Sequence, residues 1–132
     1  MIVFLDTSAF LAILDRDDRN HPKAKKTWSD LLFSENTLVR NNYALVESFA
    51  LIQHRLGMDA VRTFQEDILP LVNVEWVDES THKSGLSALL TTSKKKLSFV
   101  DCVSFEIMRH LGIRTAFTFD PHFGEQGFKC IP

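Results

Sequence analysis

Two short apolar runs that each end in an aspartate constrain the fold most. Ile2–Leu5 is uninterrupted by polar residues and is followed by Asp6, and a second run over residues 115–119 is followed by Asp120. Runs of this length are typical of parallel strands that helices cover on both faces. An aspartate directly after such a strand lies at the edge of the sheet where open α/β folds bind their ligands.

The remaining sequence alternates strand-like and helix-like segments. The apolar spacing predicts strands at residues 1–5, 37–39, 72–77, 114–119 and 128–131, and helices at residues 8–15, 22–32, 42–56, 59–69, 79–92 and 98–111. This alternation favours a mostly parallel sheet with helices on both faces, which is a three-layer α/β/α arrangement. A length of 132 residues is appropriate for a single domain over residues 1–132.

The charge of the chain limits how it could bind nucleic acid. The formal net charge is −2, which argues against binding through bulk positive charge. Two local basic clusters could still line a site, although solvated surface is the simpler interpretation of each. They are Lys23, Lys25 and Lys26, and Lys94, Lys95 and Lys96.

Other compositional features exclude several classes of protein. The two cysteines, Cys102 and Cys130, make no disulfide framework and no zinc-binding spacing. No apolar run approaches the roughly 20 residues of a membrane helix, and residues 1–6 lack the basic start of a signal peptide. We therefore expect a cytoplasmic protein without a membrane segment.

Four acidic residues are the candidate functional groups, and each has a simpler alternative role. Asp6 could cap the helix that follows it, and Glu47 could be an ordinary solvated residue within a helix. Asp101 fits a Ser-x-x-acid capping box that begins at Ser98. Asp120 precedes a proline and could simply start a turn.

The four acids point to a metal site when they are considered together. Carboxyl ends of parallel strands and the starts of the following helices share one sheet edge, so we expect the acids to converge there. At about 4 Å and an effective dielectric of ~20, each pair of ionised carboxylates costs about 4 kcal/mol. Because like charges disfavour ionisation, this repulsion raises the pKa values of the acids, which must take up protons or hold a cation. Oxygen ligands favour Mg²⁺ or Mn²⁺, and such ions support phosphodiester hydrolysis.

The sequence lacks the motifs of several rival enzymes. It has no P-loop, no glycine-rich dinucleotide fingerprint and no G-x-S-x-G elbow. Of the five histidines, His122 is nearest the expected site, and we interpret it as a turn residue at the rim of the pocket. Two other classes remain open. One is a phosphatase that uses Asp6 as its nucleophile, and the other is a non-catalytic module whose acidic groove binds a basic peptide.

Four segments in order resemble the PIN-domain ribonucleases of the VapC type, the toxins of toxin–antitoxin pairs. The resemblance covers essentially the whole chain. It is carried by residues 2–8 with Asp6, residues 42–47 with Glu47, residues 97–101 with Asp101, and residues 118–123 with Asp120. Two positions depart from the family pattern, since Arg40-Asn41 stands where Thr or Ser often precedes the Asn-Tyr pair, and Cys102 stands where Ala is common. Neither departure removes an acid.

The resemblance implies a five-stranded parallel sheet and endonucleolytic cleavage of RNA with Mg²⁺ or Mn²⁺. Asp6, Asp101 and Asp120 would bind one or two ions, and Glu47 would be a further ligand or would orient the attacking water. Thr7 and Thr118 would support these ligands. The resemblance further implies a homodimer and a small VapB-like antitoxin whose C-terminal segment enters the acidic groove.

Overall fold

The five strands lie in a single sheet in which every neighbouring pair is parallel, in the order β3-β2-β1-β4-β5. The structure is a computed structural model that describes residues 1–93 and 97–132, so the basic cluster predicted at residues 94–96 lies outside it. The strands are β1 (Ile2–Leu5), β2 (Thr37–Asn41), β3 (Asn73–Glu75), β4 (Thr115–Phe117) and β5 (Lys129–Ile131). The predicted parallel sheet is therefore confirmed.

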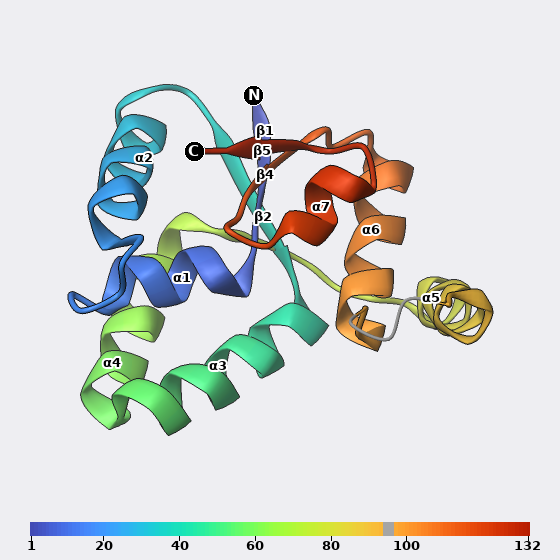
Figure 1. Cartoon of the computed structure of the whole chain (residues 1–132), viewed down its shortest axis with the longest axis horizontal. Helices are drawn as coiled ribbons and strands as arrows, with labels where there is room; N and C mark the ends of the chain where they lie inside the picture. Colours follow the sequence, from blue (N-terminus) through green and yellow to red (C-terminus); the bar gives the residue numbers. More distant parts are fainter. Residues whose placement is uncertain (94–96) are drawn as a thin grey trace.

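Helices cover both faces of this sheet (Figure 1). They are α1 (Thr7–Leu14), α2 (His21–Phe33), α3 (Asn42–Leu56), α4 (Met58–Thr63), α5 (Glu79–Thr91), α6 (Phe99–Leu111) and α7 (Pro121–Glu125). After α4 the chain continues through a π-helical turn, η1 (Phe64–Ile68), and a 3-10 turn, η2 (Leu69–Leu71). The three-layer α/β/α prediction is confirmed.

The alternation of side chains along β1 divides the core into two clusters. Val3 and Leu5 face a cluster that α1, α2, α3 and η1 complete, whereas Phe4 faces a second cluster built largely by α6 and α7. Successive side chains of a strand point to opposite faces, so a fully apolar β1 requires a helical layer on each side. Burial of β1 on both faces explains why the run at the start of the sequence contains no polar residue.

The order of the strands creates a crevice beside β1. The chain builds β1, β2 and β3 outward in one direction and then returns to place β4 on the other side of β1. Just beyond these strands, the amide of Asp6 donates to the carbonyl of Phe117 over 3.0 Å. Ligands of open α/β sheets bind at such a reversal point, outside the carboxyl ends of the strands. Asp6 and Asp120 follow the two strands that border it.

Two helical details were not given by the sequence. Gly85 is the only buried residue of helix α5, and Leu86 and Leu90 are exposed. The cause is a close approach of α5 to α6, since a Cβ added at Gly85 would lie 2.5 Å from Cγ2 of Val103. The sequence also missed the short helix α7, where it predicted only a turn after Asp120.

Among the described residues, no helix combines the length and the apolar character that crossing a membrane requires.

Candidate metal centre

All four predicted acids line one pocket of about 290 Å³ at the carboxyl ends of β1 and β4. The pocket also contains the predicted supporting residue Thr7 and one cation, Arg55 of α3. Residues separated by up to 114 positions in the sequence therefore meet in space, as the strand order predicts.

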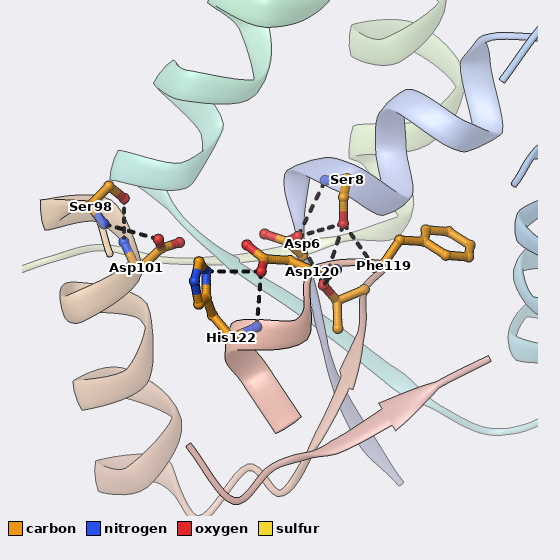
Figure 2. A network of polar contacts seen from close by, with 8 residues as sticks. Asp6, Ser8, Ser98, Asp101, Phe119, Asp120 and His122 are labelled. Atoms are coloured by element: carbon orange, nitrogen blue, oxygen red, sulfur yellow. Dashed lines mark hydrogen bonds and ion pairs between the residues drawn. The ribbon is translucent and has the colours of Figure 1, made fainter. Parts of the chain in front are cut away.

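Asp6 caps helix α1 and is held through one of its two oxygens. Its Oδ2 accepts hydrogen bonds from the Ser8 amide at 3.3 Å, the Ser8 hydroxyl at 2.6 Å and the Thr118 hydroxyl at 3.0 Å (Figure 2). The hydroxyl of Thr118 also accepts from the Asp120 amide at 2.9 Å. Thr118 therefore connects the two strand-ending acids, and the sequence-based expectation that it supports the site has a structural basis.

Asp120 caps helix α7 and lies beside His122. Its Oδ1 accepts from the His122 amide at 2.9 Å and lies 3.0 Å from His122 Nδ1, a buried atom without an aligned hydrogen bond among the described residues. Ligand atoms of Asp101, Asp120 and His122 lie within 4.8 Å of one another. His122 is thus a helical residue inside the acid cluster, whereas the sequence suggested a turn residue at its rim.

Asp101 forms the predicted capping box and also lines the pocket. The capping box is present, since Asp101 Oδ2 accepts from the Ser98 amide at 3.1 Å and the Asp101 amide donates to the Ser98 hydroxyl at 3.0 Å. The same carboxyl group faces the pocket from the start of α6 (Figure 2). A carboxylate has two oxygens, so capping a helix does not prevent it from binding an ion.

Glu47 extends from α3 into the pocket and is held by Thr7. The Thr7 hydroxyl donates to Glu47 Oε1 over 3.2 Å, and the Glu47 side chain is half-buried. The simpler interpretation of Glu47 as a solvated mid-helix residue was therefore wrong. Thr7 supports Glu47, while the neighbouring Ser8 supports Asp6.

The four carboxylates share one feature. Each uses a single oxygen for the hydrogen bonds that hold it, and within the described part of the chain the second oxygen accepts none. The second oxygens are Oδ1 of Asp6, Oε2 of Glu47, Oδ1 of Asp101 and Oδ2 of Asp120. Carboxylate oxygens at a partly buried site normally find a partner, so these four remain available to an ion or to water.

Burial, more than mutual repulsion, raises the pKa values of Glu47 and Asp101. The pKa of Glu47 is raised first by burial, then by the charges of Asp101 and Asp6, against lowering contributions from Thr7 and Arg40. The pKa of Asp101 is also raised chiefly by burial, and Asp6 and Asp120 add to it while Ser98 opposes it. The sequence correctly predicted raised values for these two groups, but it named repulsion as the cause. A cation in the pocket would offset both effects.

The structure adds a residue that the sequence did not assign to the site. Arg40 of β2 is buried beneath the pocket and donates to the hydroxyls of Thr7 at 2.8 Å and Ser48 at 2.9 Å. A charged residue directly after Leu38 and Val39 was a usable signal, because a strand that is covered on both faces rarely contains one.

The fold and the pocket define an α/β protein with a cluster of acids at the reversal point of its sheet. The PIN domain family model matches residues 3–129, and the chain belongs to this family. Over 128 residues it is 30% identical to the 23S rRNA-specific endonuclease VapC20 from two strains of Mycobacterium tuberculosis. The match spans 96% of this chain and 95% of that protein. The predicted VapC-type PIN family is therefore confirmed.

Solved structures agree with this assignment. The crystal structure of VapC20, described as a toxin that cleaves the sarcin-ricin loop, superposes with a TM-score of 0.86 over 97% of this chain and 96% of that one, at 30% identity. FitAcB from Neisseria gonorrhoeae has a TM-score of 0.69 at 17% identity, covering 100% and 97% of the two chains. FitAB bound to a DNA fragment has a TM-score of 0.71 at 17% identity, covering 99% and 94%. At 17% identity these last two show only the shared fold.

Proposed function

We propose that this protein is an Mg²⁺- or Mn²⁺-dependent endoribonuclease and the toxin of a VapBC-type pair. The convergence of four acids in one pocket, each with an oxygen that no described donor occupies, is the observation that carries the proposal. Similarity to VapC20 supports RNA as the substrate, since its name describes an endonuclease for ribosomal RNA. We further propose that residues 1–132 act as one nuclease domain in the cytoplasm.

The donor set suits a hard divalent cation. Asp6, Asp101, Asp120 and Glu47 supply oxygens, which Mg²⁺ and Mn²⁺ both accept, and the His122 imidazole nearby favours Mn²⁺ over Mg²⁺. A divalent ion bound there would acidify a water molecule and offset the negative charge of the phosphate. The ordered hydrogen bonds on the opposite oxygens would hold the ligands in place before the ion arrives.

The protein's own groups then have distinct tasks. Glu47 is suited to accept a proton at Oε2 from the attacking water, because it lines the pocket and this oxygen accepts no hydrogen bond from the described residues. Its other oxygen is held by Thr7 and would keep the side chain oriented. Arg55 at the pocket is the described cation best placed to contact an RNA phosphate.

The acidic pocket also suits a basic protein segment. We propose that a small VapB-like antitoxin inserts such a segment there, since its positive charges would satisfy the same carboxylate oxygens. We propose homodimer formation as well. It is consistent with the high exposure of Phe33 (89%), Leu90 (76%) and Trp76 (71%), although none of these residues by itself identifies the interface.

A cleavage assay with purified protein tests the proposed function. An RNA hairpin with the sequence of the sarcin-ricin loop should be cut with Mn²⁺ or Mg²⁺ and left intact with a chelator. Asp6→Asn should reduce cleavage at least about 100-fold, because even the groups that support metal ligands contribute about 10–100-fold. Asp30→Asn is the matched control, since Asp30 is exposed on α2 and pairs with Lys26. It should retain full activity.

The same assay separates the alternatives. Cleavage by Asp6→Asn at the wild-type rate would contradict the metal assignment. Hydrolysis of small phosphoesters through a covalent aspartyl-phosphate, with intact RNA, would favour the phosphatase. Binding of a basic peptide without any affinity for Mn²⁺ would favour the non-catalytic module.

A further inference from the structure

Arg40 is a buried cation without a carboxylate partner. Its side chain is 1% exposed and is the largest of the fully buried side chains. Nη1 donates to the carbonyl of Leu5, and Nη2 donates to the carbonyl of Ala44 at 2.7 Å and to the hydroxyls of Thr7 and Ser48. Nε has no hydrogen-bond partner, and the described residues provide Arg40 with no ion pair. The guanidinium therefore contacts only neutral acceptors.

Aromatic rings enclose the rest of the guanidinium. Its Cζ lies 5.5 Å from the ring centroid of Phe4 and 5.3 Å from that of Phe10, which belong to opposite layers of the core. Such rings stabilise a cation weakly. Burying a charge without a paired opposite charge is otherwise unfavourable, so a compensating negative field must come from farther away.

The pocket acids supply that field. Burial lowers the pKa of Arg40 to about 10, and the charges of Asp6, Glu47 and Asp101, in that order, act against the lowering. A guanidinium with this value remains protonated at neutral pH. Interaction between charges is mutual, and the charge of Arg40 accordingly acts against the raised pKa of Glu47.

Arg40 is also connected to one of these acids through a hydroxyl. Nη2 donates to Thr7 Oγ1, and Thr7 Oγ1 donates to Glu47 Oε1. Thr7 Oγ1 also lies 2.9 Å from Ser48 Oγ, so the single Thr7 hydrogen has two acceptors within reach, Glu47 and Ser48. The Thr7 hydroxyl therefore lies between Arg40 and Glu47, whose side chains do not touch.

We propose that Arg40 is a built-in counter-charge of the acidic pocket: it offsets part of the negative charge of the pocket when no divalent ion is bound, and it weakens the binding of that ion by repelling it. The inference rests on the proposed function, because it assumes that the four acids bind the metal. Without Arg40 the pocket would have one more unit of net negative charge. It should then bind Mn²⁺ more tightly and depend on Mn²⁺ more strongly for stability.

Titration with Mn²⁺ tests this inference without a cleavage assay. Arg40→Met removes the charge, whereas Arg40→Lys retains it. We expect Arg40→Met to bind Mn²⁺ at least about fivefold more tightly than wild type at low salt, because a like charge near the ion is removed. Arg40→Lys should stay within about twofold of wild type. Isothermal calorimetry measures both affinities.

Thermal unfolding provides the second measurement. The rise in Tm on adding saturating Mn²⁺ should be larger for Arg40→Met than for wild type, since the metal-free variant lacks its counter-charge. If Arg40→Met does not fold even with Mn²⁺, Arg40→Gln takes its place, because it is neutral but keeps amide donors for Thr7 or Ala44.

The outcomes distinguish this inference from the proposed function. Equal or weaker Mn²⁺ binding by the neutral variant than by wild type would overturn the counter-charge assignment, as would tighter binding by Arg40→Lys. A wild-type protein that does not bind Mn²⁺ at all would instead overturn the proposed function.

Discussion

Two cavities lie near opposite ends of strand β4, and they differ in charge and in how their polar groups are used. The acidic pocket at its carboxyl end has a volume of about 290 Å³, whereas the cavity at its amino end has about 740 Å³ and contains Arg109, Arg114 and Lys129. Among the described residues, the smaller cavity contains carboxylates with an oxygen that accepts no hydrogen bond, whereas the charged groups of the larger cavity are cations. The larger cavity is therefore not the one that contains the candidate metal ligands.

Helix ends explain the difference in charge. Helices α1, α6 and α7 begin beside the acidic pocket, with caps at Asp6, Ser98 and Asp120. Amino ends of helices stabilise negative charge. Helix α6 ends at the basic cavity, where Arg109 complements the carboxyl end of the helix.

The basic side chain of Arg109 is already satisfied by its own neighbours. It lies 5.3 Å from the ring centroid of Phe128 and donates to Gln126 Oε1 over 2.8 Å. These contacts give it a structural role at the end of α6, whereas the acids at the other end of β4 each keep an oxygen unbound. Three predictions test this contrast.

Loss of the Thr118 hydroxyl should have the largest effect. Thr118→Val removes the group that donates to Asp6 Oδ2 and accepts from the Asp120 amide, so both strand-ending acids lose a fixed position. We expect cleavage of RNA to fall about 10–100-fold while the fold is retained. Steady-state cleavage rates and far-UV circular dichroism measure the two quantities. A variant that keeps the wild-type rate would show that the acids do not need this support.

The change of Tm with pH should be an effect of intermediate size. The pKa values of Glu47 and Asp101 are raised in the folded protein, so the folded form binds protons more tightly than the unfolded form. Their contribution to stability is therefore fully present below about pH 4 and is lost as the pH rises through the raised folded values. In a chelator, wild-type Tm should fall by about 2–4 °C between pH 4 and pH 7 relative to the Glu47→Gln, Asp101→Asn double variant.

The control for this measurement is Mn²⁺. Adding the ion at pH 7 should restore the wild-type Tm and leave the double variant almost unchanged, because only wild type keeps all of its ligands. A parallel pH dependence in the two proteins would mean that burial of these acids does not limit stability.

Changes in the basic cavity should have the smallest effect. Arg114→Ala removes an exposed cation from the larger cavity without disturbing the pocket acids. We expect cleavage rates within about twofold of wild type, since exposed side chains away from special contacts have small effects. A tenfold loss of cleavage rate would show that RNA reaches this end of the molecule. It would also mean that both cavities, and not the acidic pocket alone, contribute to cleavage.

The sequence predicted much of this arrangement because the relevant signals are local. Apolar runs specify strands, and the position of Asp6 or Asp120 directly after such a run places the carboxylate at a sheet edge whatever the rest of the chain does. The capping box at Ser98 was readable for the same reason. The family pattern then identified all four acids that the structure brings into one pocket.

Other features could not be predicted because they depend on distances between segments that are remote in sequence. The face that α5 buries depends on the approach of Gly85 to Val103, and the place of His122 depends on where α7 packs. The alternative roles of Asp6, Asp101 and Asp120 were undecidable from sequence, because each of these carboxylates has one oxygen for its helix and another for the pocket.

The sequence alone thus determined the layers, the parallel sheet, the family and the acids, since each follows from residue periodicity or from a residue's position next to a strand or helix end. Only the tertiary structure decided which oxygens are free, that burial dominates the raised pKa values of Glu47 and Asp101, and that Arg40 lies beneath the pocket. Electrostatic fields and desolvation depend on the surroundings of a group in three dimensions, and a linear pattern does not contain them.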